Sequence, residues 1–438
     1  MIRPIPFGDA GVTTYWSEGA YSTYRGWPRA WPSIVEERLI SGATVSNLDM
    51  LDMTETAGFD QVSETFTPGL GDGTVVDTAA IRRRVGDDGS EILWTQQSTF
   101  LLVGTASGEY IASGGLFGSP ITPSSIVVRQ VSDYGSEDVY PVRAHKGLFF
   151  VTRGGQAVRK LTVDLQQNIG GDDVSFLAQH ISSRLFAQLA WVPWPDEVLW
   201  ARLGDGGLAA LTDHDEQEVR GWTTQQLPGG FIVEDIVTLP GPGRLETLWM
   251  IVSRTVGGVL QRRIWMMSQM SDGLFIDGAQ LYSGAPTATV HGLDAYDGET
   301  VRVLADGAQY DLPCAAGAVA LPAAASVVQA GLGYQTRFQS LTLDLGLIAM
   351  AMNLRQRPTQ IVTHLLTTSC LVSAAGSQFS ERISTRTAQN VPGAAPQPSI
   401  SQPSVAVGSQ RAPSIIITED SAYDHVIYSL KPMVSIGG

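Results

Sequence analysis

The segment between residues 213 and 218 holds the densest group of side chains that could do chemistry. It reads Asp213-His214-Asp215-Glu216-Gln217-Glu218, so carboxylates and an imidazole follow one another closely. Carboxylate oxygens could hold a hard cation, and a carboxylate could act as a general base. The segment lacks the glycine and the ligand spacing of a dedicated calcium loop. A solvated turn between two strands is therefore favoured over a metal or catalytic site.

Two other charged runs lie between residues 82 and 89. Arg82-Arg83-Arg84 is a short basic run that could contact a phosphate, and Asp87-Asp88-Gly89 places two carboxylates before a glycine. A basic run of this length is more often a solvated strand end or a set of partners for nearby carboxylates. Asp-Gly is a common turn dipeptide, because glycine accepts a positive φ without strain. We therefore expect a strand end followed by a turn.

Tryptophan side chains could form a platform for a carbohydrate ring. Most of them lie inside apolar runs of strand type, where core packing is the ordinary role of a large aromatic side chain. Core packing is therefore preferred over sugar binding for these residues, which are Trp27, Trp31, Trp191, Trp194, Trp200, Trp222, Trp249 and Trp265.

Familiar catalytic motifs are missing from the sequence. There is no Walker loop, Gly-x-Ser-x-Gly elbow, His-Glu-x-x-His helix or paired Cys-x-x-Cys, and the histidines are scattered. Cys314 and Cys370 are expected to be separate buried thiols, with one bridge between them as the alternative. The sequence thus predicts no catalytic, cofactor-binding or metal-ligating residue, and a protein that is not an enzyme.

The chain as a whole is acidic. Its 438 residues carry 43 acidic and 28 basic side chains, a formal net charge of −15. Such a surface repels a phosphate backbone, so sequence-specific binding of nucleic acid is not expected, whereas a conduit that lets DNA pass should have this property. No apolar run is long enough to predict a membrane span, and the first residues lack the apolar core of a signal peptide. We expect the protein to act in the cytoplasm where it is made, or in a particle assembled there.

The elements that must position these side chains are short strands separated by glycine turns. Apolar runs that turn back at Gly-Gly or Asp-Gly begin near residues 101, 148, 198, 248 and 301, a spacing of roughly fifty residues. A lone hairpin cannot bury its apolar face, but several stacked around an axis can. The pattern predicts an all-β fold with a β-propeller-like core, to which an earlier unit near residues 33–44 could belong.

Three regions are expected along the chain. An N-terminal segment covers residues 1–32, the propeller core covers residues 33–345 with an insertion at about 46–80, and a β-rich and loop-rich region covers residues 346–438. Residues 351–438 hold four acidic and six basic side chains, a net charge of +2. Because the rest of the chain is acidic, the two ends should face different neighbours. The C-terminal region is the predicted docking platform.

Short motifs follow one another in order over residues 16–340. They are Trp16–Ala20, Tyr24–Ala30, Leu102–Thr105, Gly108–Tyr110, Ile121–Pro123, Tyr134–Ser136, Pro141-Val142, Leu177–Ile181, Gln217–Val219 with Trp222, Gly292–Asp294, Gly298–Ala308 and Gly331–Tyr334. No single motif is specific, but the ordered set resembles the tail nozzle proteins of short-tailed bacteriophages, also called tail tubular protein B. The ending Val434–Gly438 is also similar to the end of that family.

The resemblance implies a homohexameric ring built around a β-propeller, below the portal and adaptor rings of the virion, through which the genome leaves. It implies the tail adaptor protein as a partner, tail fibres or tailspikes as candidate partners, and the transient passage of double-stranded DNA at the tail tip. The sequence also departs from the family. The motif at residues 24–30 follows a short N-terminal stretch in place of a long region, and the family's "QRLWFAGT" strand appears as residues 37–44. We expect a reduced domain around the propeller.

A passive conduit and gate is the mechanism that we expect from these features. Six copies at −15 each give a ring with about −90 charges, which keeps DNA from sticking to the wall. The carboxylates of Asp213, Asp215, Glu216 and Glu218 are the candidates for facing the lumen. The alternative is a receptor-binding or glycan-degrading β-propeller tail protein, which would need a cleft with paired carboxylates and exposed tryptophans.

Overall fold

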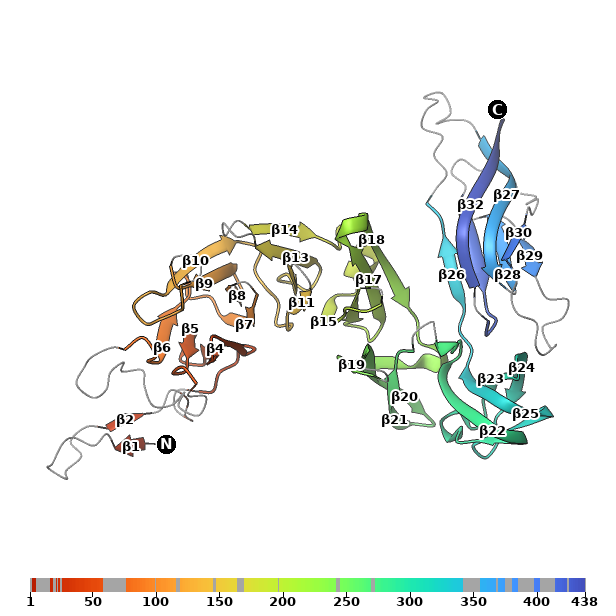
Figure 1. The fold of residues 1–438 in the computed structure, drawn as a ribbon, viewed down its shortest axis with the longest axis horizontal. Helices are drawn as coiled ribbons and strands as arrows, with labels where there is room; N and C mark the ends of the chain where they lie inside the picture. The colour runs from red at the N-terminus through yellow and green to blue at the C-terminus, as the bar shows by residue number, and fades with distance from the viewer. Residues whose placement is uncertain are drawn as a thin grey trace. The chain divides into compact units, whose positions relative to one another are not determined.

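The described residues fold mainly into antiparallel β-sheets (Figure 1). The only α-helix among the residues described is α1 (Gln179–Ser182), and no helix in that part of the chain is long and apolar enough to cross a membrane. The computed structural model describes residues 2–4, 16–18, 21, 23, 26–57, 76–98, 100–115, 119–144, 147–163, 169–195, 197–241, 245–268, 272–341, 355–367, 369–374, 380–384, 398–401, 414–423 and 425–437.

The chain divides into two compact units. The first comprises Met1–Gln226 and Ile232–Met266, and the second comprises Leu227–Phe231 and Met267–Gly438. The boundary that the sequence predicted after residue 345 therefore lies within the second unit.

The described part of the first unit forms five sheets besides a small one of β1 (Ile2–Pro4) and β2 (Trp16–Glu18). Four of the five are meanders of four strands, in which each strand pairs with the next along the chain. Their strands are β3 (Ser33–Val35), β4 (Arg38–Thr44), β5 (Asn47–Met53) and β6 (Ile81–Arg84); β7 (Ile92–Gln97), β8 (Leu101–Thr105), β9 (Glu109–Ser113) and β10 (Val127–Ser132); β11 (Val142–Ala144), β12 (Gly147–Val151), β13 (Val158–Val163) and β14 (Ile169–Asp173); and β15 (Phe186–Val192), β16 (Val198–Leu203), β17 (Leu208–His214) and β18 (Val219–Gln225). The fifth has three, β19 (Ile232–Pro240), β20 (Glu246–Val256) and β21 (Val259–Met266).

These sheets are arranged like propeller blades. First strands of neighbouring sheets contact each other, β3 with β7, β11 with β15 and β15 with β19. The second strands β8 and β12 are fully buried, whereas the outer strands β10 and β18 are mostly exposed. The prediction of an all-β, propeller-like fold is therefore confirmed.

The core lies between successive sheets, because each sheet buries apolar side chains on both faces of its inner strands. Ile40 and Leu51 of the first sheet pack with Leu101 and Val103 of the second. Phe150 of the third sheet packs with Trp94 and Leu102 of the second sheet. In the next interface, Phe149 of the third sheet joins a cluster with Leu199 and Leu211 of the fourth. Alternating apolar residues in each strand thus make one blade stack on the next.

The predicted hairpins fall in successive sheets with one exception. Those that begin near residues 101, 148, 198 and 248 are β8–β9, β12–β13, β16–β17 and β20–β21. The hairpin near residue 301 is β23–β24 in the second unit, so it does not continue the meander series. The unit near residues 33–44 is β3–β4 of the first sheet. Strand β5 occupies part of the predicted insertion at 46–80, and residues 58–75 lie outside the described part of the chain.

The second unit contains three further sheets among its described residues. Their orders are β22-β25-β23-β24, β26-β31-β28-β29 and β30-β27-β32. The strands are β22 (Asp277–His291), β23 (Thr300–Ala305), β24 (Ala308–Pro313), β25 (Ala318–Leu332), β26 (Thr336–Gln339), β27 (Arg355–Thr367), β28 (Ser369–Ala374), β29 (Ser380–Ser384), β30 (Pro398–Ser401), β31 (Ile415–Glu419) and β32 (His425–Gly437). Pairing of strands distant in sequence distinguishes this unit from the meanders of the first.

Candidate functional site

The acidic segment at residues 213–218 is held by an ion-pair network. Asp213 is the penultimate residue of β17, and its buried carboxylate accepts hydrogen bonds from Lys160 Nζ at 2.7 Å and from Arg220 Nε at 2.8 Å. Asp215 accepts a second bond from Lys160 Nζ at 2.6 Å. Because Lys160 comes from β13 and Asp213 from β17, the network joins the third sheet to the fourth.

Burial and ion pairing shift the pKa of Lys160 in opposite directions. Burial alone lowers the pKa of its ammonium group, but the hydrogen bonds and the attraction of Asp213 and Asp215 outweigh it and raise the pKa overall. The side chain also lies over the ring of Phe149, 5.6 Å from its centroid. The ammonium group is thus held in the charged form beside two carboxylates.

The four acidic candidates have different surroundings. Asp213 is buried in the ion pair, and Asp215 is partly exposed. Glu218 is exposed at the left-handed end of the 3-10 turn η2 (Asp215–Gln217), with a φ of 53°. The side chain of Glu216 lies outside what the structure describes. That any of them faces a channel stays a prediction, but Asp213 stabilises the contact between two sheets and does not present a free charge.

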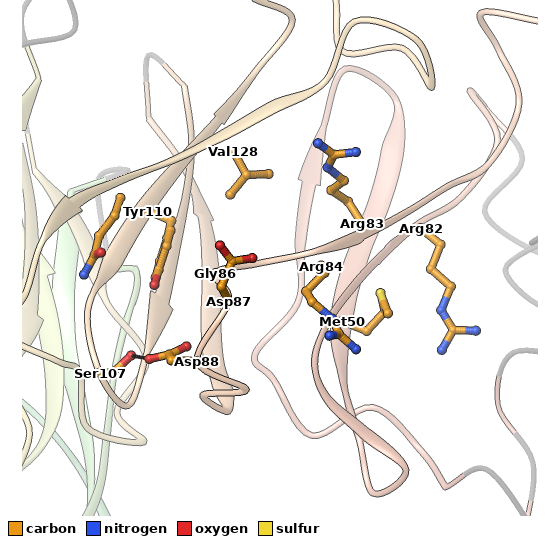
Figure 2. Close-up of a pocket in the computed structure, with 11 residues that line it drawn as sticks. Met50, Arg82, Arg83, Arg84, Gly86, Asp87, Asp88, Ser107, Tyr110 and Val128 are labelled. Atoms are coloured by element: carbon orange, nitrogen blue, oxygen red, sulfur yellow. Dashed lines mark hydrogen bonds between the residues drawn. The ribbon is translucent and has the colours of Figure 1, made fainter.

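A charged groove lies between the first two sheets of the first unit (Figure 2). It has a volume of about 1090 Å³. The residues that line it come from β5, β6 and the loop that follows on one side, and from β9, β10 and the turn before β9 on the other. They are Met50, Arg82, Arg83, Arg84, Gly86, Asp87, Asp88, Ser107, Tyr110, Val128 and Gln130.

The three arginines of this groove differ in their partners. Arg82 Nε lies 3.4 Å from Asp52 Oδ1 and Arg84 Nε lies 3.0 Å from Asp49 Oδ2, both across the β5–β6 pair. Arg83 projects from the opposite face of the strand and is exposed. The interpretation of the run as a strand end with carboxylate partners therefore holds for Arg82 and Arg84, whereas Arg83 points to the other face of the strand.

The carboxylates of the groove lie on a turn, as the Asp-Asp-Gly pattern predicted. Gly86 and Gly89 have φ values of 72° and 69°, which only glycine adopts readily. Ser107 Oγ donates a hydrogen bond to Asp88, and this bond lowers the pKa of the Asp88 carboxyl below its ordinary value (Figure 2). An ionised carboxylate suits the binding of a cationic or hydroxyl group and does not suit proton donation. The side chains that line the groove are thus mostly charged or polar.

The tryptophans do not gather into one platform. Trp191, Trp200, Trp222, Trp249 and Trp265 are partly buried in the strands of the fourth and fifth sheets, in line with the expected packing role. Trp27, Trp31 and Trp194 are exposed. Of these, Trp31 donates from Nε1 to Asp138 Oδ1 at 3.0 Å and packs edge-on against Tyr140, so its ring holds together two segments of the same unit.

Sequence reasoning missed the buried arginine of the first sheet. Arg38 on β4 donates through Nη1 to the carbonyls of Thr54 and Ala79, both at 2.7 Å, and through Nη2 to that of Asp77 at 2.8 Å. It therefore binds the backbone on both sides of residues 58–75. Arg38 is the first residue of β4 and follows Glu36 and Glu37, so its local sequence is that of an exposed charged turn and gives no signal of burial.

The class that the fold defines is an all-β protein with propeller-like sheets. No protein-family model matches the chain, and no curated protein sequence matches it. Among solved structures, the exo-β-1,3-galactanase of Phanerochaete chrysosporium with galactose is similar at a TM-score of 0.29 and 8% identity, over 94% of this chain and 96% of that one. A variant of that enzyme with β-1,3-galactotriose is similar at a TM-score of 0.27 and 10% identity, over 96% and 99% of the two chains.

These comparisons correct one expectation. Both similar structures are enzymes, which counts against the expectation of a protein that is not an enzyme, and that expectation is withdrawn. TM-scores this low assign neither an activity nor a site to this chain.

Proposed function

We propose that this chain is a virion structural protein, the tail nozzle that forms the conduit and gate for genome ejection at the end of a short bacteriophage tail. The ordered series of motifs over residues 16–340 carries the proposal. A conduit wall has to be a stiff, closed surface, and stacked sheets with buried interfaces are suited to that task.

Two of the motifs meet where the second sheet is followed by the third, which supports the proposal. Residues 102–105 and 108–110 belong to the hairpin β8–β9, and residues 134–136 connect the second sheet to the third. The buried carboxylate of Glu109 accepts hydrogen bonds from the hydroxyl groups of Ser132 and Ser136, the latter at 2.9 Å. Two motifs that are distant in sequence therefore meet in one polar contact. Motifs with such a role reflect a shared architecture more than a shared reaction.

Packing explains a further motif residue. The indole of Trp94 lies directly over Gly104, so that a Cβ at this position would overlap the ring. Glycine at this point of the Leu-Val-Gly-Thr run allows the large side chain to be fully buried between the second and third sheets. The packing of Trp94 thus explains why this motif contains a glycine.

Charge is the second support. A conduit should pass double-stranded DNA without holding it, and the formal charge of −15 per chain makes a wall that repels the phosphate backbone. In the proposed assembly six copies form the ring, residues 346–438 with their excess of basic side chains dock on the tail adaptor, and tail fibres or tailspikes attach outside. The protein then resides in the virion at the tail tip.

The first test is electron microscopy of the purified protein and of intact virions. We expect a six-fold ring at the tail tip, with a bore that admits duplex DNA. A trimeric or peripheral location in the virion would overturn the conduit and favour a receptor-binding or glycan-degrading tail protein. Activity on the surface polysaccharide of the infected cell would point the same way.

A second test addresses the docking platform. A phage that encodes a chain truncated after about residue 350 should produce virions without the nozzle, because the proposed adaptor contact is gone. Added to particles without a nozzle, the full chain should attach and the truncated chain should not. Attachment of the truncated chain would refute this role of the C-terminal region.

A further inference from the structure

Among the described residues, the fifth sheet of the first unit has three strands, whereas the other four sheets each have a fourth, outer strand. It consists of β19, β20 and β21, and β21 pairs with β20 on one side only. On its other side, β21 has no strand neighbour among the described residues. An edge of this kind leaves a row of backbone N–H and C=O groups able to pair with another strand.

Apolar side chains of β21 are more exposed than those on the third strands of other sheets. The third strand of the second sheet, β9, is buried at every position, and that of the fourth sheet, β17, at most positions. In contrast, β21 exposes Ile264 by 72% and Val259 by 64%, together with Leu260 and Met266. Exposed apolar side chains along an open edge mark a surface that associates with another strand.

A second open edge, β22 in the second unit, has matching properties. It is the edge strand of the β22-β25-β23-β24 sheet and is fifteen residues long. Residues 278–290 carry no charged side chain, and Leu281 is exposed by 59%. Natural edges are protected by charged residues, prolines or bulges; in β22 the proline and most register shifts lie beyond Ser283, so the regularly paired part, Gln280–Ser283, carries no charge.

We propose that β21 of one copy of the chain pairs with β22 of a second copy, so that the neighbour supplies the missing outer strand of the fifth sheet. The pairing of two different surfaces is a head-to-tail contact, which closes into a ring when the rotation allows it. The inference rests on the proposed function, because it identifies the contact between subunits of the nozzle ring.

The charges on β21 favour pairing with β22 of a second copy over symmetric pairing of two β21 strands. Arg263 is exposed on β21 next to Arg262, whose Nε is paired with Glu234 Oε2 of β19 at 2.7 Å. Two β21 strands paired across a two-fold axis would bring the two copies of Arg263 close together, and like charges across a strand pair are destabilising. Pairing with the uncharged part of β22 avoids this repulsion, and a second chain of net charge −15 provides an attractive field for the arginines.

Crosslinking of full-length chains tests the contact directly. A chain with Ile264→Cys is mixed with a chain with Leu281→Cys and treated with a short bis-maleimide, with each single variant and the unmodified chain treated alone as background. We expect a two-chain product in the mixture that is absent from the separate samples. If no such product forms, the proposal is overturned.

A matched pair of substitutions tests the edge. Ile264→Lys places a charge on β21, whereas Val45→Lys does so at a side chain of similar exposure, 71%, in the turn between β4 and β5. We expect loss of the assembly for Ile264→Lys and retention for Val45→Lys, with equal thermal unfolding of the two single chains. Assembly of Ile264→Lys would overturn the proposal.

The two proposals fail in different ways. A six-fold ring at the tail tip without the β21–β22 crosslink would support the nozzle and refute the proposed contact. A crosslinked assembly that is absent from the tail tip would refute the nozzle function and support the contact.

Discussion

Lys160 Nζ lies 2.7 Å from Asp213 Oδ2, and both side chains are buried where the third sheet of the first unit meets the fourth. Arg220 Nε approaches the other oxygen of the same carboxylate at 2.8 Å. The carboxylate thus receives a cation on each oxygen and loses little by being removed from water. An acidic segment that looks like an exposed turn in the sequence therefore joins two blades.

Substitution of Asp213 should be costly. Asp213→Asn leaves the buried ammonium of Lys160 with Asp215 as its remaining carboxylate, and breaking a buried pair costs roughly 3–5 kcal/mol. We expect the free energy of unfolding, measured by denaturant titration, to fall by about 3 kcal/mol. The exposed Glu218→Gln serves as control and should change it by less than about 0.5 kcal/mol. Equal effects of the two substitutions would contradict the structural role.

Gly104 should not tolerate a methyl group. In Gly104→Ala the new Cβ would overlap the indole of the buried Trp94, and overpacking of this kind costs typically about 1–3 kcal/mol. The matched control is Gly221→Ala on β18, where a Cβ meets no atom within 4 Å. Thermal unfolding should show a lowered midpoint for the first variant alone. An unchanged unfolding midpoint for Gly104→Ala would mean that Trp94 can shift to make room for the methyl group.

Arg38 should hold the ends of residues 58–75. Arg38→Met keeps the aliphatic part of the side chain but leaves the carbonyls of Thr54, Asp77 and Ala79 without this donor. A buried group left unsatisfied costs about 1–3 kcal/mol. We expect lower stability and faster proteolytic cleavage between residues 54 and 79. Cleavage at the rate of the unmodified chain would show that the arginine does not hold this segment.

Stability should depend on pH through Asp277. Burial raises the pKa of its carboxyl to about 6, above the ordinary value of 3.8. The folded state thus keeps this proton after the unfolded state has released it, so the stability contributed by the protonated group is fully present below about pH 4 and is lost as the pH rises to 6. Compared with Asp277→Asn, the unmodified chain should lose up to about 3 kcal/mol across this range. A constant difference between the two proteins would disprove the shift.

Charge reversal at Glu218 tests the acidic wall without removing the ion pair of Asp213. Glu218→Lys changes the charge of each chain by two and that of a six-fold ring by twelve. We expect tighter binding of double-stranded DNA with a steeper salt dependence, and slower genome release. Affinity and ejection kinetics that match those of Glu218→Gln would exclude Glu218 from the lumen.

Local pattern predicted the strands of the first unit, because hairpin formation depends on neighbouring residues. The runs at residues 101–105 and 147–151 became buried strands followed by glycine turns, as alternating and continuous apolar runs predict. The Asp-Asp-Gly turn at residues 87–89 follows from the freedom of glycine at positive φ. The same spacing predicted the hairpin near residue 301, which is present but lies in the sheet β22-β25-β23-β24, because the pattern of a hairpin does not specify the sheet that it joins.

The sequence by itself determined that the chain forms hairpins, that these hairpins must stack to bury their apolar faces, and that its charge repels DNA. Only the tertiary structure decided which charges are free. Lys160 and Asp213 are separated by fifty-two residues, and Arg38 holds carbonyls on both sides of a long segment, so neither partnership leaves a local signal. The open edge of β21 was likewise invisible, because a strand is covered or uncovered by residues remote in the chain. The spacing of apolar residues and the residue types of turns are local properties, whereas the burial of side chains and the pairing of strands and charges depend on the whole fold.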